Sequence, residues 1–331
     1  MKIVILDDWN HFFETQPALA QLRERGEVTI HYDRALTTEA LVERLSGARV
    51  VLANRERTRF PAELLGALPD LELISQSGGA DRHIDLQAAT RLGIAVATAP
   101  GAPNGSAAVA ELGLGLLLAL TREIPRNERR VREGDWAAPV TDVLHGRTLG
   151  VIGLGKIGRH MATVCQALGM SVIAWGPTHP DRVGTQSGAE YVAFDDLFPR
   201  VDVLFISPIL SDLTRGIVGP KQLAAMKPTS YLINISRGPI VQEAALVEAL
   251  QQRRIRGAGM DVYDEEPLPA DHPYTRLDNV VLTPHIGWAT TAHFTRFADG
   301  MIENAINYLD GNPTRIANPE ALQVKRGARA S

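Results

Sequence analysis

The chain alternates between short apolar runs and amphipathic stretches along most of its length. In the first hundred residues, runs rich in aliphatic side chains are separated by stretches with helical periodicity. The predicted strands are Ile3–Leu6, Val28–His31, Val50–Ala53, Leu71–Ser75 and Ala95–Thr98, and the predicted helices are Pro17–Arg25, Thr38–Leu45, Pro61–Leu68 and Ile84–Leu92. Strands that alternate with helices predict βαβ units, and therefore a parallel sheet with helices on both faces.

A second series of the same kind begins near residue 148. Its predicted strands are Leu149–Ile152, Ser171–Trp175, Val203–Ser207, Tyr231–Ile235, Gly257–Val262 and Val280–Thr283, with helices between them such as Gln242–Arg253. One long helical stretch, from about 104 to 132 with a break near Pro125, separates the two series. Another, from about 290 to 309, follows the second series. The pattern predicts two doubly wound α/β domains, with the C-terminal segment returning to the first.

The composition narrows the class of protein further. The chain has 331 residues, 45% of them hydrophobic, and a net charge of −4. We expect a globular protein with no nucleic-acid partner, because no domain carries the basic excess that phosphate binding needs. An acidic residue, Asp7, comes too early for a signal peptide, and the longest apolar stretch, Leu112–Leu120, is far shorter than the roughly 20 residues of a membrane helix. We therefore expect no membrane partner. The single cysteine, Cys165, allows no intramolecular disulfide, which fits the cytoplasm that we expect for this protein.

A glycine-rich loop opens the second series. The hexapeptide at 153–158, GLGKIG, matches G-x-G-x-x-G, and the predicted strand Leu149–Ile152 comes directly before it. A helix follows and ends near Gly169; one of its faces carries Ile157, Met161, Val164, Cys165 and Leu168. This strand–turn–helix context is typical of dinucleotide binding, whereas the hexapeptide alone is weak evidence. A βα turn without a ligand is the ordinary alternative, and a kinase loop is disfavoured further because no H-R-D or D-F-G motif follows.

Each element of the loop has a separate physical reason. Gly153 permits the tight turn, Gly155 lets the backbone approach a pyrophosphate, and Gly158 lets the helix pack against the strand. The helix N-terminus, at Lys156 and Ile157, offers unpaired N–H groups and the positive end of a dipole. The sequence therefore predicts a dinucleotide cofactor.

Three ionisable side chains follow successive strands of the second series. Arg237, Glu266 and His285 come after the strands that begin at 231, 257 and 280. Ligands of parallel sheets bind at the carboxyl ends of the strands, so we expect these groups to share one edge with the glycine loop. Taken singly, each is more often a structural or solvated residue. Their coincidence behind a dinucleotide loop favours a catalytic role.

These residue types suit hydride transfer to a carbonyl. His285 can donate the proton, because the ordinary pKa of histidine, about 6.5, lies near working pH. Glu266 would favour the imidazolium and hold its tautomer. Arg237 offers a planar fork of donors to a carboxylate.

At these residues the chain closely resembles the D-isomer-specific 2-hydroxyacid dehydrogenase family, which includes glyoxylate, hydroxypyruvate and phosphoglycerate dehydrogenases. The likeness spans most of residues 70 to 305. The matching stretches are PGAPN at 100–104, VAE at 109–111, the glycine loop, NISRGPIV at 234–241, MDVYDEEP at 260–267 and LTPHIG at 282–287.

The resemblance implies a fold, an activity and a set of site residues. A Rossmann cofactor domain, residues 99–286, is inserted in a flavodoxin-like substrate domain, residues 1–98 plus 287–331, and the two close over the reactants. The enzyme moves a hydride between nicotinamide and C2 of a D-2-hydroxy acid or 2-keto acid, with Arg237, Glu266 and His285 catalytic. We expect a homodimer, built largely on the helix from about Asn104. No metal is expected.

The resemblance also assigns binding residues. Asp261 would contact the nicotinamide carboxamide. The other cofactor contacts are expected from Gly153, Gly155, Lys156, Ile157, Gly158, Trp175, Gly176, Ser207, Ser236 and His285. Substrate contacts are expected from Arg55, Gly78, Gly79, Arg237, His285 and Trp288.

Three stretches depart from the family pattern. The substrate loop, commonly G-x-G-x-D-x-I-D, reads GGADRHID at 78–85, and SPIL at 207–210 replaces the frequent His-x-Pro-Leu. Trp175 is followed by Gly176 and Pro177, where an acidic residue that selects NAD is expected. We therefore predict weak discrimination between NAD and NADP with a lean to NAD, and Arg182 is the candidate for a 2′-phosphate contact.

Two questions stay open at this level. The substrate is not identified: Arg55 and Arg57 follow a predicted strand and Trp9 follows another, yet each residue is also an ordinary loop or core position. A different function on the same fold is that of a nucleotide-sensing corepressor, which would be expected to show a peptide groove or long extensions. The chain has no long extensions, so the enzyme is the leading hypothesis.

Overall fold

The computed structural model describes residues 1–79, 83–178, 184–186 and 188–324, with no side-chain description for 184–186. It divides into two compact units, which are considered separately. Unit 1 comprises Met1–Pro103 and Thr291–Ser331, and unit 2 comprises Asn104–Thr290. These limits fall a few residues after the limits expected from the sequence, 98 and 286.

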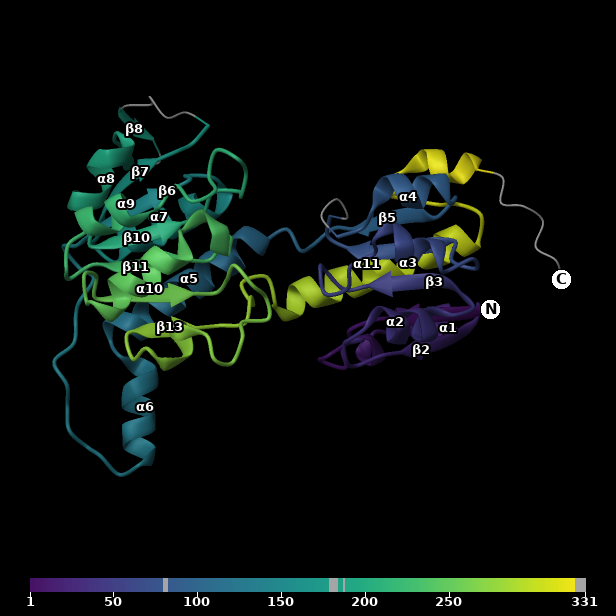
Figure 1. Cartoon of the computed structure of the whole chain (residues 1–331), viewed down its shortest axis with the longest axis horizontal. Coiled ribbons are helices and arrows are strands. Elements are labelled where there is room, and N and C mark those ends of the chain that lie inside the picture. Colours follow the sequence, from purple (N-terminus) through teal and green to yellow (C-terminus); the bar gives the residue numbers. More distant parts are fainter. Residues whose placement is uncertain (80–82, 179–183, 187, 325–331) are drawn as a thin grey trace. The chain divides into compact units, whose positions relative to one another are not determined.

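Unit 1 is a five-stranded parallel sheet in the order β2-β1-β3-β4-β5. This is the flavodoxin-like order that the resemblance implied. The long helix α11 lies along the strands in Figure 1, and the hydroxyl of Ser75 in β4 donates to the Met301 carbonyl of that helix (2.9 Å). The strands are β1 (Lys2–Ile5), β2 (Glu27–Ile30), β3 (Ala48–Ala53), β4 (Leu73–Ser77) and β5 (Ala95–Ala99), and the helices are α1 (Ala18–Arg23), α2 (Thr38–Leu45), α3 (Ala62–Gly66), α4 (Leu86–Arg91) and α11 (Thr291–Leu309), with short 3-10 turns at Phe13–Thr15 and Pro319–Gln323.

Local sequence explains where the helices of unit 1 begin. Thr37 caps α2 by accepting a hydrogen bond from the amide of Ala40, and Asp85 caps α4 by accepting one from Ala88 (2.8 Å). The predicted helix from Ile84 therefore begins later, because Asp85 takes the capping position.

Unit 2 is an eight-stranded sheet in the order β13-β12-β11-β10-β6-β7-β9-β8. All neighbouring pairs are parallel except β8 and β9, which form an antiparallel hairpin. The strands are β6 (Thr148–Ile152), β7 (Ser171–Trp175), β8 (Gly184–Gln186), β9 (Ala189–Tyr191), β10 (Val203–Ile206), β11 (Tyr231–Asn234), β12 (Gly257–Met260) and β13 (Val280–Leu282). The helices are α5 (Gly105–Thr121), α6 (Ile124–Arg132), α7 (Lys156–Ala167), α8 (Phe194–Arg200), α9 (Pro220–Ala225) and α10 (Glu243–Gln251), with 3-10 turns at Gly238–Ile240 and Pro273–Arg276.

Apart from the β8–β9 hairpin, this is the doubly wound dinucleotide-binding order, so the predicted fold class is confirmed. The hairpin itself was not predicted. The two core clusters of the unit lie on opposite faces of the sheet, because successive side chains alternate: Ile152 packs with α8–α10, and Val151 with α5 and α7. Gly113 lets α5 approach the sheet closely, since a Cβ there would lie 2.6 Å from the Phe205 ring.

The long helix expected from about 104 to 132 is interrupted in the structure. α5 ends at Thr121, Glu123 adopts a left-handed backbone (φ 49°), and α6 begins at Ile124 with Pro125 in its first turn. Proline is tolerated in the first turn of a helix but not in its interior, so the break falls just before Pro125. Figure 1 shows α6 projecting from the rest of the unit, followed by an extended segment that returns to β6. None of the described helices is both long and apolar enough to cross a membrane.

Candidate functional site

The strand register of unit 2 brings distant residues to one edge of the sheet. Ile206, Asn234, Met260 and Leu282 lie side by side across β10, β11, β12 and β13. The residues that follow each strand therefore emerge together at the carboxyl edge.

At this edge the glycine turn after β6 has a distinct geometry at each glycine. Gly153 has a φ of 89°, and a Cβ there would lie 2.8 Å from the Pro208 nitrogen. Gly158 packs so closely that a Cβ would lie 2.4 Å from the Gly153 carbonyl oxygen. At Gly155, by contrast, nothing lies within 4 Å of the Cβ position. Two glycines are thus needed for the turn and its packing, and the middle one leaves space for a ligand.

The start of α7 suits an anionic group. The first intrahelical hydrogen bond runs from the Arg159 amide to the Gly155 carbonyl (3.0 Å), so the amides of Lys156, Ile157 and Gly158 precede it. The Arg159 guanidinium donates to the Leu154 carbonyl (3.2 Å), which places a cation beside the turn in addition to Lys156. The arrangement fits the pyrophosphate of a dinucleotide. Sequence reasoning missed Arg159, although it directly follows the third glycine.

At the end of β7, Trp175 and Gly176 play different parts. The Trp175 side chain is only 9% exposed and packs in the core, with its ring centroid 4.5 Å from that of Phe194. Its carbonyl accepts the Gly153 amide (2.8 Å), so only its backbone lies at the glycine turn. No atom of the described residues lies within 4 Å of a Cβ at Gly176. The 2′-phosphate candidate, Arg182, lies outside the described residues, as do His179 and Asp181.

Two serines expected to contact the cofactor hold loops together at this edge. The Ser207 hydroxyl lies 2.8 Å from the Gly153 carbonyl oxygen and 3.2 Å from that of Ile152, which ties β10 to the glycine turn. The Ser236 hydroxyl donates to the Pro208 carbonyl. Both hydroxyls keep oxygen lone pairs that can accept hydrogen bonds from a ligand.

Beside these loops, His285 and Glu266 form an acid–base pair. His285 Nδ1 lies 2.7 Å from Glu266 Oε2, and Glu266 Oε1 accepts the amide of Tyr263 (3.0 Å). Burial favours a higher pKa for Glu266, but the hydrogen bond and charge of His285, the Tyr263 amide and the charge of Arg237 outweigh it. The pKa of Glu266 is therefore below its usual value, and the carboxylate is ionised at neutral pH.

Arg237 follows β11 and is half-buried. Its guanidinium donates to the Ser236 carbonyl (2.6 Å), and its own carbonyl accepts the side-chain amide of Asn234 (3.1 Å). The next residue, Gly238, packs against the chain at Tyr263, where a Cβ would lie 2.1 Å from the Tyr263 carbonyl carbon. The loop that carries Arg237 is thus held against the loop that carries Glu266.

Asp261 holds the turn around His285. Its Oδ1 accepts the Thr283 hydroxyl (2.6 Å) and the Ile286 amide (2.8 Å), and its Oδ2 accepts the Gly287 amide (2.9 Å). Burial is the largest influence on this carboxyl group and raises its pKa, against the lowering effect of these hydrogen bonds and of His285. The resemblance implied a contact with the nicotinamide; the structure adds this structural role, which spacing alone did not indicate.

Unit 1 carries the other expected substrate residues. Arg55 has a left-handed backbone (φ 54°), and its Nη1 would lie 2.5 Å from a Cβ at Gly78. Its guanidinium also lies over the Phe297 ring, 5.7 Å from the centroid. Arg55 and Gly78 therefore meet, Gly79 is exposed beside them, and residues 80–82 of the loop lie outside the described residues.

The two other candidates of unit 1, Trp9 and Arg57, also meet. The Arg57 guanidinium stacks over the Trp9 ring, 4.0 Å from its centroid, and donates to the Asp7 carbonyl (2.6 Å). The remaining candidate, Trp288, lies in unit 2 just after the His285 turn and is half-buried. The structure thus groups the catalytic candidates within unit 2 and pairs the arginines of unit 1 with neighbouring side chains.

Comparisons with known proteins agree with this geometry. Residues 114–287, more than half of the chain, match the model for "D-isomer specific 2-hydroxyacid dehydrogenase, NAD binding domain". A glyoxylate reductase from Thermofilum pendens is 35% identical over 320 residues, which cover 94% of each chain. A D-3-phosphoglycerate dehydrogenase from Methanocaldococcus jannaschii is 37% identical over 88% of this chain, but the match spans only 54% of that longer protein.

Solved structures extend the likeness to three dimensions. The crystal structure of a phosphoglycerate oxidoreductase from Vibrio cholerae superposes with a TM-score of 0.85 and is 34% identical. The match covers 94% of this chain and 99% of that one. With a family model over half of its length and relatives above 30% identity along nearly all of it, the chain belongs to the D-isomer-specific 2-hydroxyacid dehydrogenase family.

Proposed function

We propose that the protein catalyses reversible hydride transfer between a nicotinamide dinucleotide and C2 of a small 2-hydroxy or 2-keto acid. The observation that carries the proposal is the 2.7 Å contact between His285 and Glu266, at the same edge of an NAD-binding domain as Arg237. The corepressor alternative gains no support, since the relatives compared above are named as enzymes.

In reduction, bound NAD(P)H supplies the hydride that reaches C2 of the keto acid. His285 donates a proton to the carbonyl oxygen from Nε2, because Nδ1 is engaged by Glu266. The ionised Glu266 fixes the tautomer and stabilises the imidazolium. Arg237 binds the carboxylate and stabilises the negative charge that develops on the oxygen. In oxidation, His285 accepts the same proton from the hydroxyl group.

The proposal extends to the residues that bind the reactants. The Gly153–Gly158 turn binds the pyrophosphate, Gly176 lies beside the adenosine ribose, and Ser207, Ser236 and Asp261 contact the nicotinamide half. NAD is the cofactor, with NADP a close alternative. Arg55, Gly78, Gly79 and Trp288 contact the substrate together with Arg237 and His285.

A substrate panel tests the function. NADH and NADPH oxidation is followed at 340 nm with glyoxylate, hydroxypyruvate, pyruvate and keto acids that carry bulky or second-carboxylate side chains. Turnover of at least one keto acid that His285→Ala abolishes supports the proposal. Absence of turnover across the panel in both directions, by protein that binds NADH, contradicts it.

We also propose that the protein is a cytoplasmic homodimer that pairs through α6 and the segment 133–143. None of the residues of α6 is buried, and several large apolar side chains of α6 and of the segment 133–143 are exposed to solvent. They include Ile124, Val131, Val140, Val143 and Trp136, which is 85% exposed. An exposed group of large apolar side chains is typical of a protein interface.

A neighbouring pocket and an edge strand give a second copy a place to dock. The pocket, of about 580 Å³, lies between α6 and β13, with an apolar floor that includes Leu120 and Val280 and a rim that includes Arg126 and Arg129. β13 ends the order of the described sheet and so offers an unpaired edge. The lining holds four arginines against two carboxylates, Glu123 and Asp278, and its net positive charge complements the acidic residues of the segment, such as Glu133.

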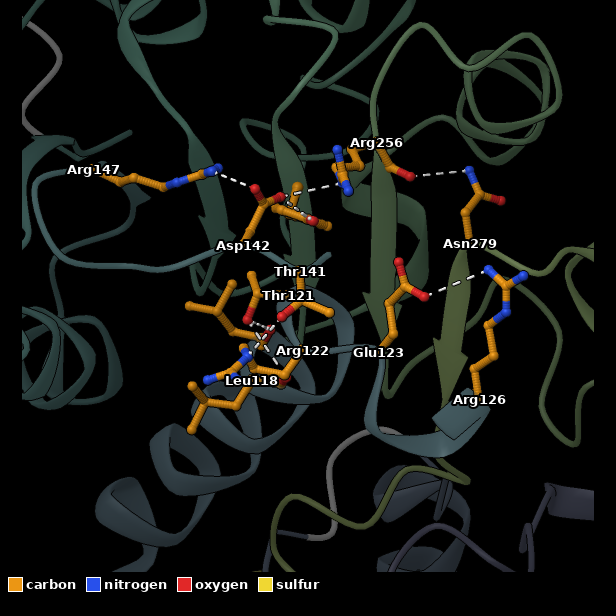
Figure 2. Close-up of polar contacts among 12 residues, drawn as sticks. Leu118, Thr121, Arg122, Glu123, Arg126, Thr141, Asp142, Arg147, Arg256 and Asn279 are labelled. Atoms are coloured by element: carbon orange, nitrogen blue, oxygen red, sulfur yellow. Dashed lines mark hydrogen bonds and ion pairs between the residues drawn. The ribbon is translucent and has the colours of Figure 1, made fainter. Parts of the chain in front are cut away.

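The exposed segment is anchored where it rejoins the domain. Figure 2 shows Asp142 between Arg147 and Arg256, and the Arg122 side chain at Thr141. Asp142 accepts hydrogen bonds from Arg147 (2.7 Å) and from the Tyr231 hydroxyl (2.8 Å), and lies 3.2 Å from Arg256. The anchor holds one end of the segment in place while its apolar residues stay open to a partner.

Light scattering coupled to size-exclusion chromatography tests the dimer. Wild-type protein is expected at twice the mass of one chain, and Trp136→Asp at the mass of one chain at micromolar concentration. Leu36→Asp is the matched control, because Leu36 is equally open but lies in unit 1. A monomeric wild type, or equal dissociation of both variants, contradicts this interface.

A further inference from the structure

Tyr263 contacts Glu266 itself and the backbone segments that hold the other two catalytic candidates, Arg237 and His285. It comes two residues after Asp261, and its side chain is buried. Its amide donates to Glu266 Oε1 (3.0 Å), and its backbone is the surface against which Gly238, next to Arg237, packs. These contacts belong to the main chain, and any residue at 263 except proline would make the hydrogen bond to Glu266.

The hydroxyl of Tyr263 makes a contact that only this side chain can make. It lies 2.9 Å from the carbonyl oxygen of Thr283 and 3.1 Å from that of Met260, so its proton is shared between the ends of β13 and β12. The same Thr283 carbonyl accepts the amide of His285 (3.0 Å). One carbonyl oxygen therefore links the hydroxyl to the backbone of the proposed acid.

The backbone of His285 needs such support. Its φ is 54°, in the left-handed region that non-glycine residues rarely occupy and that persists only when the surroundings enforce it. Asp261 holds the residues after His285 through two amides, and the Thr283 carbonyl holds the residue itself. Without the hydroxyl, that carbonyl loses the bond that fixes its direction.

Resting on the function proposed above, we infer that Tyr263 is a positioning residue for His285, and that its hydroxyl sets the direction in which the imidazole presents Nε2 to the substrate oxygen. Tyr263 does not touch the reacting atoms. Burial is the main reason that the pKa of Tyr263 lies well above its usual value, so the hydroxyl keeps its proton and remains a donor throughout the working pH range.

The ordinary alternative is that Tyr263 only fills the core. Its ring packs near that of Tyr274, with centroids 6.5 Å apart, and both rings belong to the same core cluster. Tyr274 is also buried, and the hydrogen bonds found for it among the described residues, from its amide to His272 Nδ1 and to its carbonyl from the Leu277 amide, do not reach the turn at 283–287. Phenylalanine at either position keeps the ring and removes one oxygen, so the two variants form a matched pair.

Steady-state kinetics of the intact enzyme test the inference. Tyr263→Phe is expected to lower kcat about ten-fold, because a misplacement of about 1 Å can cost up to about 10² in rate. The Kd for NADH, measured by fluorescence quenching, is expected to stay within about two-fold, since the glycine turn is untouched. Tyr274→Phe is expected to keep kcat within about two-fold. Equal losses of kcat in the two variants, or more than half of wild-type kcat in Tyr263→Phe, overturn the inference.

A spectroscopic readout separates this inference from the proposed function. In protein labelled with ¹⁵N-histidine, the His285 ring signals are assigned as those that His285→Gln removes. Tyr263→Phe is expected to shift or broaden these signals, whereas Tyr274→Phe is expected to leave them in place. If no keto acid is turned over and the signals still move only in Tyr263→Phe, the function fails and the positioning role stands. Unchanged signals overturn the positioning role, whatever the substrate.

Discussion

The two edges of the sheet in unit 2 both carry charged side chains, but their surroundings differ. At the amino ends of the strands, Asp202 accepts the amide of Thr148 (2.8 Å) and the ammonium of Lys227 (2.9 Å). Asp142 is held by Arg147, Tyr231 and Arg256 at the same edge. At the carboxyl ends, the ionisable pair is His285 and Glu266, both partly exposed, and His285 has a strained backbone.

The difference separates scaffolding from chemistry. Each contact at the amino edge joins one strand or loop to another. The charged groups there are paired with other groups of the fold. At the carboxyl edge, hydrogen bonds orient the catalytic candidates. Asp261, Asn234 and the Tyr263 amide each hold a segment that carries one of them. Substitutions at the amino edge should therefore lower stability and leave turnover nearly unchanged, whereas substitutions at the carboxyl edge should mainly change catalysis.

The largest effect on turnover is expected for His285→Ala. The variant should lose about 10²–10⁴ in kcat, the usual contribution of a positioned acid–base group, and should still bind NADH. Steady-state kinetics and NADH fluorescence check both parts. More than about a tenth of wild-type kcat would remove His285 from the role assigned to it.

Arg237→Lys is expected to be damaging although the charge is kept. One ammonium cannot reproduce the two parallel hydrogen bonds of a guanidinium, and hydrogen bonds to charged groups contribute roughly 1.5–3 kcal/mol. We expect kcat/KM to fall roughly ten- to a hundred-fold, with KM rising and kcat falling. Near-normal values of both parameters would place Arg237 outside the active site.

A carboxylate added at the carboxyl edge should change selectivity instead of rate. Wild-type enzyme is expected to prefer NAD over NADP by less than about a hundred-fold, because Gly176 stands where an acidic residue would repel the 2′-phosphate. Gly176→Asp should raise the ratio of kcat/KM for NAD over NADP about ten-fold, in line with a gain of roughly 1.5 kcal/mol. Among the described residues, no atom lies within 4 Å of the Gly176 Cβ position to obstruct the new side chain. An unchanged ratio would show that the adenosine ribose lies elsewhere.

Asp202→Ala, at the amino edge, should have the smallest effect on turnover. It leaves the Thr148 amide and Lys227 without their acceptor, so the free energy of unfolding should fall by about 1–3 kcal/mol. Urea unfolding measures that loss, and kcat at 25 °C is expected to stay within about two-fold. A loss of kcat comparable to that of Arg237→Lys would contradict the division of labour between the edges.

Much of this architecture could be predicted from the sequence. The strand–glycine turn–helix unit around Gly153 was identified correctly, since its sterics depend on adjacent residues. The convergence of Arg237, Glu266 and His285 followed from a general rule about parallel sheets and not from any local pattern. Both inferences rest on physics that acts within one strand or across neighbouring strands.

Features that depend on tertiary contacts could not be predicted in this way. The face of α7 was assigned imperfectly: Val164 is 38% exposed and Leu168 40% exposed, because the close packing at Gly158 sets which side of the helix faces the sheet. The hairpin of β8 and β9 was missed because each strand is too short to show a period. The anchoring role of Asp261 and the left-handed backbone of His285 arise from contacts between segments 25 or 26 residues apart, and neither segment alone has a sequence pattern that predicts them.

The division of the chain into a continuous and a discontinuous unit has a consequence for biosynthesis. Unit 2 is one uninterrupted stretch, Asn104–Thr290, whereas unit 1 needs α11 and the residues after it. Asn318 caps the edge strand β5 of unit 1 through the Val96 amide (2.8 Å) and the Ile94 carbonyl (3.0 Å), and these bonds close a loop of more than two hundred residues. On the ribosome, the cofactor domain can therefore fold as soon as it has emerged. The five strands of unit 1 are synthesised first, but α11, which packs on them, emerges only after the whole of unit 2. For that interval the part of the unit 1 sheet that α11 packs against stays exposed, and exposed apolar surface of this kind is prone to aggregation.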